Sequence, residues 1–173
     1  MSEFFQRVTG DQDPFKKLAS YIPGFSGYVE RENRRAADKL MRDTVARRFE
    51  ELYKRLSALQ ADLISQGGIE SIDDLEKAAL QIRTFTDKVR NATYGYAGLF
   101  DAVKINEAEL AKLYTYDAAF FDLADQIKAA MDTLEASLGN TEALPATIRN
   151  LVTLSRQAVD GFDRRAEVFN APK

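Results

Sequence analysis

Two groups of carboxylates are spaced so that they could hold a metal ion. Asp122 and Asp125 lie three residues apart on one expected helix, and Glu107 and Glu109 lie in the segment that leads into it. Carboxylate oxygens are the ligands that Mg²⁺ and Ca²⁺ prefer. A di-iron centre would also need Glu-x-x-His motifs, and the chain has no histidine. Because solvated carboxylates are far more common than metal sites, we expect no metal and no other cofactor.

The absence of two residue types narrows the possible chemistry further. The chain has no cysteine and no histidine, which excludes disulfides, zinc–thiolate sites and thiol nucleophiles and removes the commonest general base. No nucleophile elbow, Walker loop or dinucleotide fingerprint occurs. The single G-x-x-G, Gly95 to Gly98, does not follow a strand and indicates a helix bend rather than a phosphate cradle. We therefore expect that the protein is not an enzyme.

One enzymatic or ligand-binding alternative stays open, and it depends on a group of tyrosines around an acidic residue. Asp117 is the odd polar member of an otherwise apolar helical stripe. A ligand-binding or catalytic bundle would combine it with the tyrosines around it, which are Tyr94, Tyr96, Tyr114 and Tyr116. This alternative requires an internal cavity between the helices.

Two clusters of aromatic residues and glycines are the other chemically distinctive segments. The first is "YIPGFSGY" from Tyr21 to Tyr28, and the second surrounds "TYGYAGLF", which ends at Phe100. Both fall at the same end of an antiparallel bundle, where we expect them to meet and close the core. Since tyrosine and arginine are typical interface anchors, the same end also provides the candidate partner-binding residues. These are Tyr21, Phe25, Tyr28, Arg31, Arg34, Arg35, Tyr94, Tyr96 and Phe100.

Charge is unevenly distributed along a chain whose net charge is only −3. Residues 28–55 contain nine Lys/Arg and six Asp/Glu, whereas residues 101–142 contain nine Asp/Glu and three Lys. The two segments are expected to complement each other within one bundle. The interleaved acids make a nucleic-acid partner unlikely, since clustered positive charge supplies most of such affinity. An anionic membrane surface stays possible through the arginine-rich start of the first long helix.

Composition and hydrophobic spacing predict an all-α protein. Of 173 residues, 45% are hydrophobic, which is enough for one core. Residues 1–13 are expected to form a flexible arm and 14–173 a single helical-bundle domain, with a short helix after Pro14 that Asp13 caps. Long helices are predicted over about 28–66, 71–95, 106–138 and 145–169. This pattern indicates a four-helix up-down-up-down bundle with an extra-long first helix.

The first long helix carries the clearest pattern. Its apolar residues recur at alternating spacings of four and three, as in a heptad repeat, and they are Val45, Phe49, Leu52, Leu56, Leu59 and Leu63. Gly67 is a candidate C-cap for this helix, and Ser71 with Asp74 approximates a capping box for the next one.

No apolar run is long enough to span a bilayer, and the N-terminus has no apolar region typical of a signal peptide. We therefore expect a cytoplasmic location, with membrane association as the variant.

Two segments resemble recurrent sequences in a group of bacterial hypothetical proteins. They are "IPGFSGYVERENRRAADKLMRD" and "GYAGLFDAVKINEAELAKLYTYD", and the resemblance covers roughly Phe15 to Leu123. It implies a bacterial cytoplasmic protein and brings no activity, cofactor or site residue with it.

The leading functional hypothesis is a non-enzymatic adaptor or scaffold. It would present its long first helix and aromatic end to a protein partner or to a second copy of itself. Apolar residues exposed on that helix beyond the bundle would support this hypothesis, and full burial of both aromatic clusters would weaken it. The alternative is a peripheral membrane-associated factor that uses the aromatic corner and the arginine-rich helix start.

Overall fold

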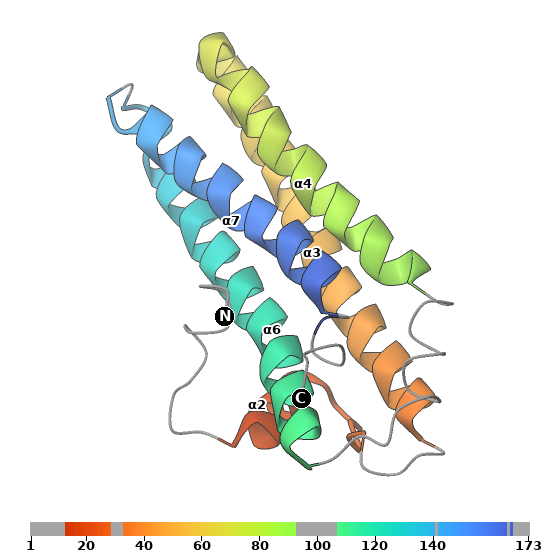
Figure 1. The fold of residues 1–173 in the computed structure, drawn as a ribbon. Helices are drawn as coiled ribbons and strands as arrows, with labels where there is room; N and C mark the ends of the chain where they lie inside the picture. The colour runs from red at the N-terminus through yellow and green to blue at the C-terminus, as the bar shows by residue number, and fades with distance from the viewer. Residues whose placement is uncertain (1–12, 29–32, 93–106, 141, 166, 168–173) are drawn as a thin grey trace.

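The computed structural model describes residues 13–28, 33–92, 107–140, 142–165 and 167, and those residues form an all-α bundle (Figure 1). The four long helices are α3 (Arg34–Ser65), α4 (Ile72–Asn91), α6 (Glu107–Ala136) and α7 (Leu144–Arg164). They run up, down, up and down, and α3 is the longest of them at 32 residues. The short helix α2 (Pro14–Tyr21) lies against α6. The predicted fold class is confirmed.

One phenylalanine from each long helix meets in the middle of the bundle. The ring of Phe49 on α3 lies 4.1 Å, centre to centre, from the ring of Phe85 on α4. Phe85 also lies 5.4 Å from Phe120 on α6 and 6.0 Å from Phe162 on α7. All four rings are buried, and tilted or edge-on arrangements of this kind are favourable for aromatic pairs. The four helices therefore share one core layer.

The predicted charge complementarity between the basic and acidic segments is confirmed along the contact of α3 with α6. Arg48 on α3 pairs with Asp125 on α6 at 3.1 Å. About two turns further along α3, Arg55 pairs with Asp132 at 2.6 Å and with Glu135 at 2.9 Å. These side chains are partly exposed, so each pair contributes at most about 1 kcal/mol. Together they favour α6 as the partner of this face of α3.

The turn between α3 and α4 confirms one predicted cap and contradicts another. Gly67 has a φ of 81°, and its N–H donates to the carbonyl of Ile64, as expected for a glycine that ends a helix. The short 3₁₀ helix η1 (Ile69–Ser71) then runs directly into α4. Ser71 adopts a helical backbone and makes no side-chain cap, because an N-cap needs an extended backbone to reach back to the helix. The predicted capping box of Ser71 with Asp74 is therefore wrong.

The chain between α2 and α3 also differs from the prediction. The side chain of Asp13 accepts a hydrogen bond from the N–H of Phe15, so the predicted N-cap of the short helix is confirmed. The long helix, however, begins at Arg34 rather than near Tyr28. Gly27 has a φ of 84°, which turns the chain so that Tyr28 enters the core.

Within the described residues, no helix is both long and apolar enough to cross a membrane.

Candidate functional site

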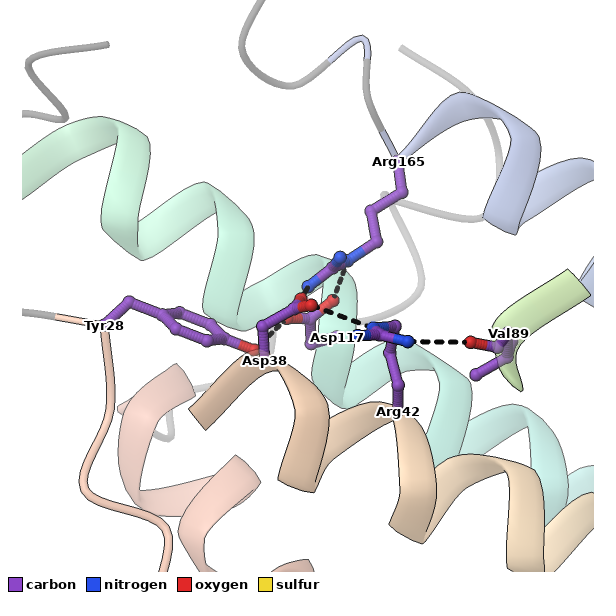
Figure 2. A network of polar contacts seen from close by, with 6 residues as sticks. All are labelled: Tyr28, Asp38, Arg42, Val89, Asp117 and Arg165. Carbon is purple, nitrogen blue, oxygen red and sulfur yellow. Dashed lines mark hydrogen bonds and ion pairs between the residues drawn. The ribbon is translucent and has the colours of Figure 1, made fainter. Parts of the chain in front are cut away.

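A buried group of charged side chains lies at the end of the bundle next to α2 (Figure 2). Arg165, directly after α7, donates from Nε and Nη2 to the two carboxylate oxygens of Asp117 on α6, at 2.6 and 2.8 Å. The same guanidinium forms an ion pair with Asp38 on α3 at 2.9 Å. Arg165 and Asp117 have no solvent-exposed surface. Arg165 thus joins α6 and α3 to the end of α7 through two carboxylates.

Three further groups extend this cluster to α4 and to the loop before α3. The hydroxyl of Tyr28 donates to Asp117 at 2.8 Å. Arg42 donates from Nε to Asp38 at 2.8 Å and from Nη1 to the backbone carbonyl of Val89 on α4 at 3.2 Å. We call Tyr28, Asp38, Arg42, Asp117 and Arg165 the buried network. It contacts every long helix of the bundle, as Figure 2 shows.

The charges of the buried network balance, because two arginines face two aspartates. Burial raises the pKa of Asp117, while the charge and hydrogen bonds of Arg165 act in the opposite direction. Burial alone would lower the pKa of Arg165, but the carboxylates of Asp117 and Asp38 raise it well above its ordinary value. Burial and the charge of Asp117 also raise the pKa of Tyr28. The tyrosine hydroxyl thus remains a proton donor, and Arg165 remains a cation.

Most polar atoms of the network find partners within it, although the buried Oδ1 of Asp38 makes only its ion pair with Arg165 and no hydrogen bond to any described residue. A buried ion pair stabilises a fold only when hydrogen bonds compensate for the loss of water around both charges. Asp117 accepts from Tyr28 as well as from Arg165, and Asp38 lies between two arginines. No side chain of the network is more than slightly exposed. The arrangement can fix the relative positions of the helices, and it offers no accessible group for attack on a substrate.

The aromatic corner packs directly beside the network. The ring of Tyr28 stacks on that of Tyr114 with centres 5.3 Å apart, and the hydroxyl of Tyr114 accepts from the N–H of Tyr28 at 2.7 Å. Phe15 and Phe25 make edge-on contacts with the Tyr114 ring. A Cβ on Gly27 would lie 2.8 Å from the Tyr114 hydroxyl, so only glycine fits this approach. The corner is a packed part of the core.

The predicted partner-binding residues therefore have different positions in the structure. Phe25 and Tyr28 are buried, and Tyr21, the last residue of α2, is half-buried against Phe121 of α6. Arg34 donates from Nε to the backbone carbonyl of Tyr28 at 2.6 Å, whereas Arg35 is exposed. The structure thus brings Tyr21, Phe25, Tyr28 and Arg34 to one end of the bundle. The remaining candidates lie outside the described residues, and they are Arg31, Tyr94, Tyr96 and Phe100.

Two of the four carboxylates considered as metal ligands, Asp122 and Asp125, pair with basic side chains. Asp122 pairs with Lys17 of α2 at 2.6 Å and accepts from the hydroxyl of Tyr21 at 3.2 Å. Asp125 pairs with Arg48. Among the residues that the structure describes, no group of three or more acidic side chains has a geometry that could hold a metal ion.

Sequence reasoning singled out Asp117 but missed its partners. Asp38 and Arg42 are four residues apart, as in an ordinary surface ion pair on a helix, and Arg165 stands among other charges near the end of α7. The heptad spacing of α3 contained a signal: counting back from Val45 by three and then four residues gives Arg42 and Asp38. Both charges therefore occupy positions that the pattern assigns to the core.

Two surface grooves run along α3. One lies between α3 and α6, and its lining residues are Arg48, Glu51, Leu52, Arg55, Ala124, Asp125 and Lys128. The other lies between α3 and α4, and its lining residues are Glu50, Tyr53, Arg83, Thr86, Asp87 and Arg90. We call them the α3–α6 groove and the α3–α4 groove.

Comparison of the chain with protein-family models, curated proteins and solved structures finds no match.

Proposed function

We propose that the protein is a non-enzymatic interaction protein, an adaptor or scaffold, that binds an amphipathic helix of a protein partner in the α3–α4 groove. The observation that carries this proposal is the exposure of large aliphatic side chains beside that groove. Leu80 on α4 is 61% exposed and Ile64 on α3 is 52% exposed. Ile64 lies on the first long helix and Leu80 on the second, and exposed apolar side chains that lie together are typical of interaction sites.

Helical spacing places these side chains along the groove. Leu80 precedes Arg83 and Asp87 by three and seven residues, so it shares their face of α4. Ile64 follows Tyr53 by eleven residues, close to three full turns, and therefore shares its face of α3. Arg83, Asp87 and Tyr53 all line the groove. The apolar side chains thus extend the groove toward the turn between α3 and α4.

A helix is the partner whose shape suits this surface. Two neighbouring antiparallel helices leave between them a groove into which the side-chain ridge of a third helix packs. Helix-in-groove recognition uses apolar anchors at spacings of three and four residues with charges at the edges. Tyr53, Ile64 and Leu80 supply apolar contacts, and the ion pair of Glu50 with Arg90 crosses the groove at its other end.

The buried network supports the same proposal indirectly. It holds α3 and α4 in register, because Arg42 of α3 donates to the carbonyl of Val89 on α4. A partner that binds both helices would therefore meet a preorganised surface, which reduces the entropy lost on binding.

The test is affinity capture from native lysate with matched variants. Leu80→Glu should abolish recovery of a stoichiometric partner, because it places a charge among the apolar contacts. Leu40→Glu is the control, since Leu40 is another exposed leucine, at 37%, on a different face of α3. Circular dichroism checks that both variants fold. Equal recovery with the two variants, or no stoichiometric partner with the unmodified protein, would contradict the proposal.

A further inference from the structure

The short helix α2 ends where the α3–α6 groove begins. Its last residue, Tyr21, stacks on Phe121 of α6 with ring centres 4.8 Å apart, and its hydroxyl lies 3.4 Å from Asp125. The guanidinium of Arg48 on α3 lies over the same ring, 5.1 Å from its centre. Arg48 and Asp125 both line the α3–α6 groove. One surface of α3 and α6 therefore continues from beneath Tyr21 into the groove.

The contacts of α2 show what kind of segment this surface accepts. Leu18 and Ile22 are fully buried and supply an apolar face. Lys17 pairs with Asp122 of α6 at 2.6 Å, and Tyr21 provides an aromatic ring to Arg48, a favourable cation–π contact. The surface thus selects an amphipathic helix with a basic residue on its edge and an aromatic residue in its last turn.

Fewer fully buried side chains hold α2 in place than hold each of the long helices. α2 has eight residues. Isolated helices shorter than about 12 to 15 residues are only marginally stable in water, so α2 would not be stable by itself. Its ion pair is partly exposed and contributes at most about 1 kcal/mol. Leu18 is the fully buried side chain of α2 and Ile22 follows directly after the helix, whereas each long helix buries many more. Phe15, Ala19 and Tyr21 are partly buried against the core. Most of its stability must come from docking.

A hinge separates α2 from the next fixed point of the chain. Tyr28 is held in the buried network by its hydroxyl, and the loop beside it also contacts α2, since the ring of Phe25 lies 6.1 Å from that of Phe15. Between α2 and Tyr28, Gly24 has a φ of 79°, and a Cβ on it would meet no atom within 4 Å. Pro23 and Gly24 are both exposed. Rotation at Pro23 and Gly24 would meet no packed neighbour at Gly24 and would move α2 while Tyr28 stays in place.

We propose that α2 is a displaceable strap, an internal ligand that covers one end of the α3–α6 surface. An amphipathic helix of a partner, with a basic residue for Asp122 and an aromatic residue for Arg48, takes its place and extends into the groove. This proposal concerns the other side of α3 and does not depend on the α3–α4 groove. Binding at this site is then limited by how often α2 is released.

The first test is native-state hydrogen exchange of the unmodified full chain. The amides of α2 should exchange through local opening, about 100-fold or more faster than those in the middle of α6. Tyr28 and the residues of α3 should remain protected under the same conditions. Exchange of α2 at the rate of the α6 core would show that α2 leaves only on global unfolding, and it would overturn the proposal.

The second test uses a fluorescent peptide with the sequence of residues 13–22. The variant with Lys17→Glu and Tyr21→Ala should release its own α2 and bind this peptide at least about tenfold more tightly than the unmodified protein does. A peptide carrying Lys17→Glu is the control and should bind poorly, since it would meet Asp122 with a like charge. A folded variant that does not bind the peptide would overturn the proposal. If the variant does not fold, the exchange rates of the unmodified chain decide.

Discussion

The guanidinium of Arg165, one residue beyond α7, binds both carboxylate oxygens of Asp117 in the first half of α6. This bidentate contact joins the end of α7 to α6, and neither side chain reaches solvent. Asp38, which lies on α3, forms an ion pair with the same guanidinium. The contact therefore fixes three helices at the end of the bundle that α2 covers.

Arg165→Ala should lower the free energy of unfolding by about 3–5 kcal/mol, because it leaves buried carboxylates without their main cation. Arg164→Ala is the matched control, since Arg164 is the exposed neighbour in the chain and should change stability by no more than about 0.5 kcal/mol. Urea denaturation measures both. Similar losses for the two variants would mean that Arg165 contributes no more than a surface charge.

Tyr28→Phe should cost about 1–3 kcal/mol, because it removes the hydroxyl that donates to the buried carboxylate of Asp117. Tyr53→Phe is the control, since the Tyr53 hydroxyl has no hydrogen-bond partner among the described residues and its loss should be nearly neutral. Thermal and urea denaturation compare the two variants. A neutral Tyr28→Phe would show that the hydroxyl adds nothing to the network.

The hydroxyl of Tyr21 should lose its proton at a higher pH than an ordinary tyrosine. Partial burial and the negative charges of Asp122 and Asp125 raise its pKa to about 12, and the hydrogen bond to Asp122 adds to this effect. The difference in tyrosinate absorbance between the unmodified protein and Tyr21→Phe isolates its titration. Asp122→Asn together with Asp125→Asn should bring that pKa back toward 10. A titration of Tyr21 near pH 10 in the unmodified protein would contradict the contacts of α2.

The same shift makes a contribution to stability that depends on pH. The folded-state pKa of Tyr21 is raised, so the contribution is complete below the unfolded pKa of about 10. Between pH 10 and 12 the unfolded chain loses this proton while the folded chain keeps it. The stability difference between the unmodified protein and Tyr21→Phe should therefore shrink as the pH rises through this window, as measured by urea denaturation. An increase over the same window would have the wrong sign.

Gly27→Ala should be more destabilising than Gly24→Ala. Both residues have a positive φ, so an alanine at either position costs about 1–2 kcal/mol of backbone strain. At Gly27 the added Cβ would also lie 2.8 Å from the Tyr114 hydroxyl and 2.9 Å from the Phe15 ring, which adds about 1–3 kcal/mol of overpacking. Thermal denaturation of the two variants gives the comparison. Equal losses of stability in the two variants would mean that Tyr114 and Phe15 move to accommodate the added Cβ at no cost.

Much of the fold was predictable because it depends on repeating patterns. The heptad spacing of α3 from Val45 to Leu63 defines a buried stripe whichever helices pack on it, and Gly67 ends the helix by a local rule. The start of α3 was not predictable in the same way. Tyr28 continues a helical pattern in the sequence, but Gly27 and the stacking on Tyr114 draw it out of the helix and into the core.

The buried network was predictable only in part. An aspartate in an apolar stripe, as at Asp117, requires a buried cation, but the sequence does not say which of the 24 basic residues supplies it. Arg165 reaches Asp117 because the end of α7 packs beside α6. That arrangement depends on the tertiary fold and cannot be seen in the local sequence. The exposure of Leu80 beside the α3–α4 groove likewise depends on which side of α4 faces the other helices.

Site-specific photo-cross-linking tests the proposed interaction surface most directly. A photoreactive phenylalanine analogue replaces Leu80 in one protein and Leu40 in another, and both are irradiated in native lysate. We expect the position of Leu80 to form an adduct with a helical segment of one protein partner and the position of Leu40 to form none. Adducts at Leu40 alone, or the same adducts at both positions, would contradict a partner-binding surface at the α3–α4 groove.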